Sequence, residues 1–61
     1  MREVIIGDFV DTIFNVSGIL IDVSNTPFSN PYGSKTAYIA MPSGRICYCP
    51  VDALKDCIYK E

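Results

Sequence analysis

Three cysteines near the C-terminal end of the chain are the residues whose type and spacing could support chemistry. One residue separates Cys47 from Cys49, so in an extended strand both thiols would point to the same face. Cys57 follows eight residues after Cys49. Because the chain has no histidine, these thiols fall short of the usual four-ligand zinc site unless Asp52 or Asp56 joins them.

The same thiols also have a structural interpretation. Free cysteine is among the residue types most often found buried. Two cysteines at positions i and i+2 of one strand are poorly placed to bridge each other, and an odd number argues against a disulfide framework. We therefore expect Cys47, Cys49 and Cys57 to be buried structural thiols, with no metal and no cofactor. Metal binding and redox or interchain pairing are the alternatives.

Catalysis has little support in the remaining residues. The aspartates are spread over expected turns and strand faces, where we expect Asp8 to shape a turn and Asp52 to cap a short helical turn. Residues 33–36, Gly-Ser-Lys-Thr, lack the upstream glycine and the following helix of a phosphate-binding loop. We expect no catalytic residues and no enzymatic activity.

The elements that position these residues are expected to be short strands. The chain contains eight Ile, five Val and three Thr, and β-branched side chains favour strands over helices. Pro42 and Pro50 belong at strand ends, where a missing amide hydrogen is tolerated. The expected strands span 9–14, 19–23, 37–41, 46–49 and 57–59, with one 3₁₀ turn over 51–54.

A single small core is expected for the whole chain, residues 1–61. A chain of this length buries only about 60% of the surface that its unfolded form exposes. In the strand 19–23, alternation places Ile19, Ile21 and Val23 on one face, which we assign to the core. The predicted core comprises Val10, Ile19, Ile21, Val23, Ile39, Met41, Cys47, Cys49 and Leu54.

The order of the segments resembles a known group of folds. The segments are Gly7-Asp8-Phe9-Val10, residues 17–23, residues 38–45 and residues 50–54. Their order resembles the SH3-like small β-barrels, a group that includes KOW and Tudor-like domains, over roughly residues 7–59. The resemblance implies an all-β fold, a small SH3-like barrel of about five short strands with one 3₁₀ turn before the last strand. It also implies a tendency to bind partners.

Aromatic residues are the candidate binding residues. Five of them cannot all fit inside so small a barrel: Phe14, Phe28, Tyr32, Tyr48 and Tyr59. Phe28 and Tyr32 lie in a long loop, 24–34, of the kind that often binds partners. Tyr48 lies between the two cysteines and points to the opposite face. We predict that Phe28, Tyr32 and Tyr48 form a partner-binding patch; the alternative is that Phe28 and Tyr32 fold back over the barrel mouth.

Charge and hydropathy narrow the class of protein. The formal net charge is −2, and the five basic residues are scattered, which is unlike a nucleic-acid-binding surface. Because the sequence has no apolar stretch long enough to cross a bilayer and no signal peptide, we expect a cytoplasmic location. We predict a non-enzymatic protein-interaction module, such as a small phage or bacterial accessory or regulatory factor. Self-association through the same patch is a further alternative. The alternative is a KOW-like nucleic-acid or ribosome-associated domain.

Overall fold

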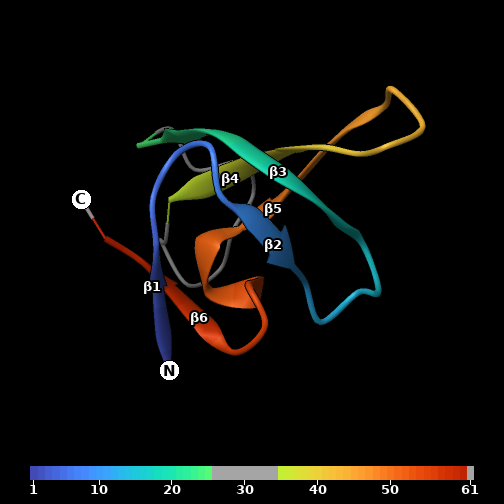
Figure 1. Ribbon diagram of the computed structural model, residues 1–61. Helices are drawn as coiled ribbons and strands as arrows, with labels where there is room; N and C mark the ends of the chain where they lie inside the picture. Colours follow the sequence, from blue (N-terminus) through green and yellow to red (C-terminus); the bar gives the residue numbers. More distant parts are fainter. Residues whose placement is uncertain (26–34, 61) are drawn as a thin grey trace.

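The protein folds into short strands and one 3₁₀ turn (Figure 1). The computed structural model describes residues 1–25 and 35–60. The elements within them are β1 (Arg2–Val4), β2 (Phe9–Asp11), β3 (Ser17–Ser24), β4 (Thr36–Ala40), β5 (Ile46–Pro50), η1 (Val51–Ala53) and β6 (Cys57–Tyr59). The predicted all-β class is confirmed, as is a 3₁₀ turn before the last strand.

The strands form two sheets. β2, β3, β4 and β5 form an antiparallel sheet in that order, whereas β1 and β6 pair in parallel. Strand pairing within the described residues does not join the two sheets into a closed barrel, so the predicted closure is not confirmed. At the outer edge of β2, an isolated bridge between Thr12 and Leu54 attaches the residues that follow η1.

The first antiparallel hairpin is shorter than predicted, because the chain turns at Thr12 instead of continuing to Phe14. The Thr12 hydroxyl accepts the N–H groups of Phe14 and Val16, each at 3.2 Å. Asn15 has a φ of 62°, in the left-handed region that asparagine tolerates. Side-chain bonding to the nearby backbone therefore ends β2 early and leaves Phe14 exposed in a turn.

A bulge in β3 changes which residues face the core. Leu20 lies opposite Ile39 and Asp22 lies opposite Tyr38, so Ile21 is an extra residue in the ladder. Such a residue interrupts the alternation of side chains along a strand. Leu20 faces the core before the bulge, and Val23, beyond it, also packs against the core. The predicted alternation would place Ile19 and Val23 on the same face. Because Ile21 is an extra residue, Ile19 instead faces solvent while Val23 packs against the core.

The assignment of Ile19 and Ile21 to the core is therefore wrong. Both side chains are 40% exposed, while Leu20, predicted to face the other way, is fully buried. Four other predicted core residues are buried, namely Val10, Ile39, Cys49 and Leu54. Val23, Met41 and Cys47 are half-buried.

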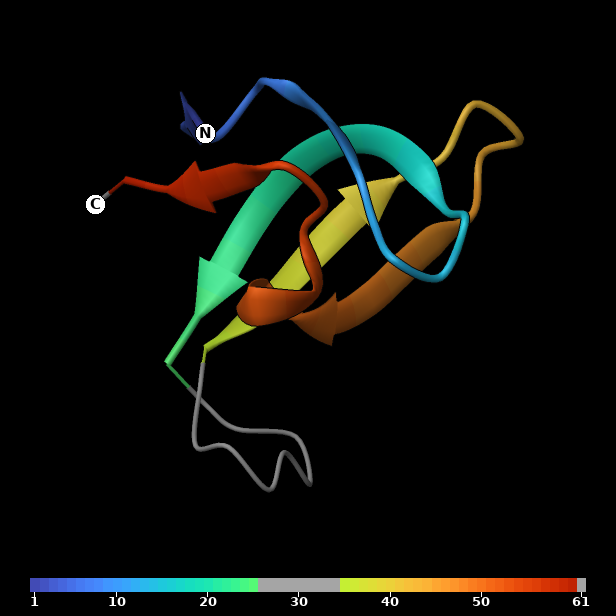
Figure 2. The same ribbon diagram turned by 90° about the horizontal axis from the view of Figure 1, so that it is seen from below.

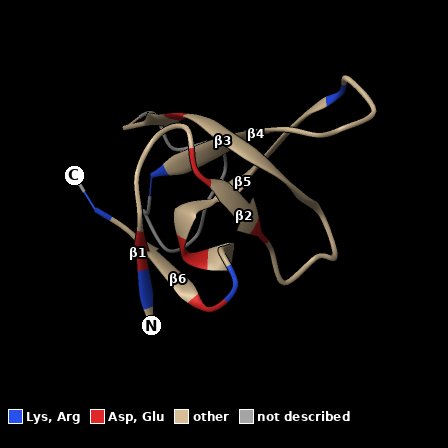
Figure 3. Cartoon of the chain, in the orientation of Figure 1, with Lys and Arg blue, Asp and Glu red and all other residues tan. Residues whose placement is uncertain are grey.

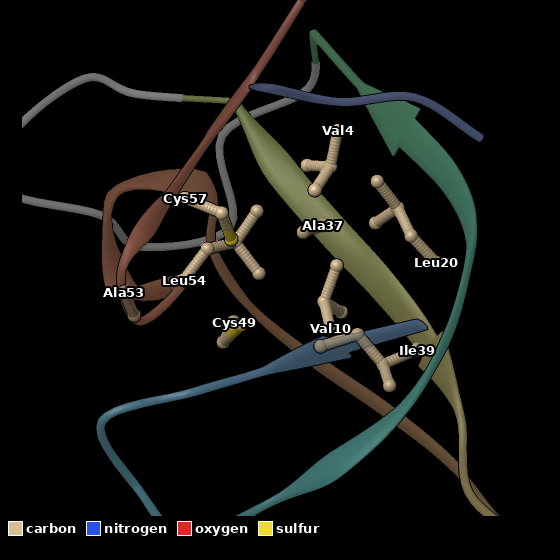
Figure 4. Packing of buried hydrophobic residues seen from close by; sticks show 9 residues of the cluster. All are labelled: Val4, Val10, Leu20, Ala37, Ile39, Cys49, Ala53, Leu54 and Cys57. Carbon is tan, nitrogen blue, oxygen red and sulfur yellow. The ribbon is translucent and has the colours of Figure 1, made fainter. Parts of the chain in front are cut away.

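The core lies between the four-stranded sheet and the β1–β6 pair with η1 (Figures 2 and 4). Val4 from β1 and Cys57 from β6 belong to the same buried cluster as Leu20 and Ile39 from the sheet. The cluster comprises Val4, Val10, Leu20, Ala37, Ile39, Cys49, Ala53, Leu54 and Cys57. Figures 1 and 2 show η1 and the β1–β6 pair on one side of this sheet, so its inner face is the covered one.

Gly18 allows β3 and β4 to come close together. A Cβ atom at this position would overlap the carbonyl oxygen of Ala40 and would lie 2.9 Å from Cγ2 of Ile39. A second glycine, Gly44, has a φ of 92° in the turn between β4 and β5 and donates its N–H to the carbonyl of Met41 at 2.9 Å. Gly18 is therefore required because a Cβ atom has no room there, and Gly44 is favoured because its φ lies in the left-handed region.

Candidate functional site

The paired cysteines line the inner face of β5. Cys47 lies opposite Ile39, and Cys49 lies opposite Ala37. Cys49 and Cys57 are buried, Cys47 is half-buried, and all three are free thiols. The inward orientation predicted for Cys47 and Cys49 is confirmed. In the part of the chain that the structure describes, no group of three or more Cys, Asp or Glu side chains is placed to hold a metal ion.

Burial changes the acidity of one thiol. Desolvation raises the pKa of Cys49, and the nearby Cys47 side chain raises it further because two negative charges would repel each other. A raised pKa keeps Cys49 protonated at neutral pH, whereas the nucleophile and the metal ligand is the thiolate. The environment of Cys49 therefore favours packing over reactivity.

Two aspartates were assigned structural roles from the sequence, and one assignment holds. The Asp8 carboxylate accepts the N–H of Ile5 at 3.0 Å and so stabilises the turn through Gly7, whose φ is 102°. Asp52 lies within the first turn of η1 and does not cap it, because the residue at the N-cap is Pro50. Proline is suited to this position through its fixed φ, which is −57° here.

Tyr48 points away from the core, as predicted. Its side chain is 56% exposed, and it lies directly opposite Tyr38 on β4. The two ring centroids are 6.3 Å apart and the rings are tilted by 40°, within the range of favourable aromatic pairs. The other two residues of the predicted patch, Phe28 and Tyr32, lie outside the described residues.

An apolar row crosses the four-stranded sheet on the same side as Tyr48. Phe9 lies opposite Ile19, Ile19 opposite Ala40, and Ala40 opposite Ile46, so one side chain from each strand enters the row. Directly opposite residues in an antiparallel ladder point to the same face. Phe9 is 51% exposed and Ile46 is 61% exposed, while Ala40 is half-buried.

We call this surface the outer face. It comprises Phe9, Ile19, Tyr38, Ala40, Ile46 and Tyr48, and the exposed Asp22, which lies opposite Tyr38, borders it on β3. Large apolar side chains from four strands are contiguous there because strand register aligns them, not because they are close in sequence. Single exposed apolar residues are ordinary, but a contiguous apolar patch of this kind commonly marks a binding surface.

Sequence reasoning missed most of the outer face. Ile19 was assigned to the core, and Phe9 and Tyr38 were not considered as binding residues. The available signal was the parity of β4 and β5. Once Ile39 and Cys47 are assigned inward, Tyr38 and Ile46 must point outward. Phe9 and Ile19 could join them only after the β2–β3 register was known.

Two cavities open on the described surface, and of the outer-face residues only Tyr48 lines one of them, the smaller. The larger has a volume of about 380 Å³ and lies beside η1 and β6, where Lys35, Asp52, Cys57 and Tyr59 contribute to its walls. The smaller has a volume of about 100 Å³ and lies between the β2–β3 turn and β5, next to Phe14, Cys47 and Cys49. Neither cavity includes the row from Phe9 to Ile46.

Charged residues are spread over the molecule (Figure 3). The basic residues lie on different elements: Arg2 on β1, Lys35 before β4, Arg45 before β5, Lys55 after η1 and Lys60 after β6. Lys60 forms an ion pair with Glu3 at 3.2 Å, and both side chains are exposed. Among residues 1–25 and 35–60, no helix has the length and apolar character needed to cross a membrane.

Comparisons with protein families, with curated proteins and with solved structures found no significant match for this chain. The chain is therefore classified by its fold and its surface alone. In the described residues, the chain is a small all-β protein with an apolar sheet face whose side chains are partly exposed.

Proposed function

We propose that this chain is a non-enzymatic protein-interaction module that binds through the outer face. The observation that carries the proposal is the apolar row formed by Phe9, Ile19, Ala40 and Ile46, which spans all four strands of the sheet. Tyr38 and Tyr48 extend it along the strands. Aromatic residues are enriched at protein interfaces, where charged residues are depleted from the centre.

The free energy available from this surface supports binding. Each of the exposed aromatic or branched side chains presents roughly 100 Å² of apolar surface, about half of a large side chain. Removal of apolar surface from water stabilises a complex by about 25 cal/mol per Å² before the costs of association. Ile46 and Tyr48 contribute the most exposed side chains of this surface, at 61% and 56%.

We also propose that the molecule is an SH3-like small barrel in its overall plan. The order of strands, η1 before β6 and the bridge between Thr12 and Leu54 support this plan. The three free thiols support a cytoplasmic location, since free thiols persist in reducing compartments. A small accessory or regulatory factor that acts by binding another protein fits these features, and Phe28 and Tyr32 remain predicted contributors to its binding surface.

The experiment is a pull-down with matched variants. The chain and its Ile46→Ser and Ile58→Ser variants are immobilised, incubated with nuclease-treated lysate of the native host, and the retained proteins are identified by mass spectrometry. Ile58 is a matched control because it is 54% exposed on β6, outside the outer face. We expect Ile46→Ser to lose the retained partner at least tenfold and Ile58→Ser to keep it.

Circular dichroism checks that both variants remain folded. Equal retention by both folded variants would contradict the proposal, because the outer face would then contribute nothing to binding. If the unmodified chain retains a partner from untreated lysate but not from nuclease-treated lysate, the result would instead favour the nucleic-acid alternative.

A further inference from the structure

We infer that Cys47 and Cys49 together form a site that binds one Cu(I) ion through two thiolates. The site lies on the inner face of β5 and does not rest on the function proposed for the outer face. Both side chains line the smaller cavity, and both are free thiols. Within residues 1–25 and 35–60, no hydrogen bond engages either sulfur atom, so both are available to a ligand.

The spacing of the two cysteines along β5 favours a metal bridge over a disulfide. Each residue of a strand advances the chain by about 3.3 Å, so residues i and i+2 lie about 6.6 Å apart. A disulfide holds its sulfur atoms about 2.05 Å apart and most often joins Cα atoms that are about 5.5–6 Å apart. A metal ion between two sulfur atoms, with bonds of about 2.3 Å, separates them by up to about 4.6 Å. Cys47 and Cys49 meet the longer requirement more easily.

The cavity gives the ion room and a path from solvent. Its volume is about 100 Å³, whereas one water molecule needs only about 10–15 Å³ of such space. Cys47 is half-buried, and Cys49 is 7% exposed. Phe14, Val16 and Ile39 make much of the remaining wall apolar. Hard cations such as Mg²⁺ and Ca²⁺ need oxygen ligands, so this lining suits a soft ion.

The number of available ligands selects the metal. Thiolates favour Cu(I), Zn²⁺ and iron–sulfur clusters. Structural zinc sites and iron–sulfur clusters take four protein ligands, and the described residues contain no group of three or more Cys, Asp or Glu that could hold a metal ion. Thr12 and Tyr48 also line the cavity, but neutral hydroxyl groups are poor ligands for a soft ion. Cu(I) is stable with two thiolates in a line, so it is the ion that this pair fits.

Binding exchanges two protons for the ion. Each thiol releases its proton to solvent as its sulfur–copper bond forms, and copper stays as Cu(I), so no oxidant or reductant takes part. Burial of Cys49 opposes the loss of its proton, and the bonds between a soft ion and soft sulfur atoms offset that cost. The complex carries one negative charge, which half-buried Cys47 leaves in contact with solvent.

Anaerobic titration of the reduced full chain with Cu(I), in competition with the coloured chelator bicinchoninate, tests the inference. We expect each chain to take one Cu(I) ion from the chelator. Cys47→Ala and Cys49→Ala should each lower the affinity at least about a hundredfold, because loss of a group that only supports a metal ligand already costs tenfold to a hundredfold. Cys57→Ala is the matched control and should bind like the unmodified chain, because this buried thiol lines the other cavity. Circular dichroism confirms that each variant is folded.

Two measurements on the unmodified chain decide the matter even where a cysteine variant loses stability. X-ray absorption at the copper edge should show two sulfur neighbours, and native mass spectrometry should show one ion on one chain. A third or fourth sulfur neighbour, or an ion shared by two chains, would overturn the two-thiolate site. Failure to take up Cu(I), equal losses with Cys47→Ala and Cys57→Ala, or preferential retention of Zn²⁺ would overturn it as well.

Discussion

The thiol of Cys49 lies on the inner face of β5, and its burial raises its pKa above the ordinary value of 9.0. Cys47, two residues away on the same face, is half-buried and contributes to the shift. A thiol that gives up its proton less readily in the folded state than in the unfolded state couples folding to pH. The sequence position of Cys49 suggests a reactive site, but the folded state stabilises the protonated form of its thiol.

We predict a loss of stability at alkaline pH that depends on Cys49. Because the folded state binds the proton more tightly, this contribution is fully present below the unfolded pKa and is lost as the pH rises through the raised folded pKa. Urea unfolding at a series of pH values from 7 to about 10 measures the decline. Cys49→Ala should show a shallower decline, although its stability at neutral pH is lower. Parallel declines in both proteins would show that other groups cause the effect.

Among the strands, β3 shows most clearly how one element can contradict its own sequence pattern. Its sequence alternates in a way that places Ile19, Ile21 and Val23 together, but the bulge at Ile21 inserts one residue into the ladder. Leu20 is consequently buried opposite Ile39, and Ile19 joins the outer face. Because of this extra residue, the Leu20 side chain points into the core and the Ile19 side chain points to the outer face.

A pair of neighbouring substitutions tests this arrangement. We expect Leu20→Ala to lower the free energy of unfolding by about 2–5 kcal/mol, because it leaves a cavity in the core. Ile21→Ala should change it by only about 0.5 kcal/mol, because Ile21 is exposed. Chemical denaturation compares the two midpoints. A larger loss for Ile21→Ala than for Leu20→Ala would mean that β3 follows the simple alternation after all.

For the whole molecule, the β1–β6 pair completes the core. Val4 is fully buried and its carbonyl accepts the N–H of Lys60 at 2.9 Å, while Cys57 packs into the same cluster. The two ends of the chain are therefore held together over the inner face of the four-stranded sheet (Figure 2). A small domain has little stability to spare, about 0.05–0.15 kcal/mol per residue, so this contribution matters.

We predict that Val4→Ala lowers the free energy of unfolding by roughly 2 kcal/mol, from two lost methyl groups at about 0.8 kcal/mol each and a small cavity. Its neighbour Glu3 provides the control. Glu3→Ala removes only an exposed ion pair with Lys60 and should cost less than about 1 kcal/mol. Urea denaturation distinguishes the two. Similar small losses for both would show that β1 is not part of the cooperative core.

The sequence determined the local features of this protein, because local chemistry specifies them. The β-branched composition, the prolines at strand ends and the turn at Gly44 predicted an all-β chain with strands near 37–41, 46–49 and 57–59. The spacing of Cys47, Tyr48 and Cys49 was sufficient to predict which side chain points outward. Alternation along one regular strand requires no knowledge of its neighbours.

Tertiary structure decided whatever depends on how strands meet. The bulge at Ile21 arises from the pairing of β3 with β4, and the burial of Val4 arises from a pairing between the two ends of the chain. The outer face exists because register aligns Phe9, Ile19 and Ile46, which lie far apart in the sequence. Register is a relation between strands, and a one-residue change in it moves a side chain from the core to the surface.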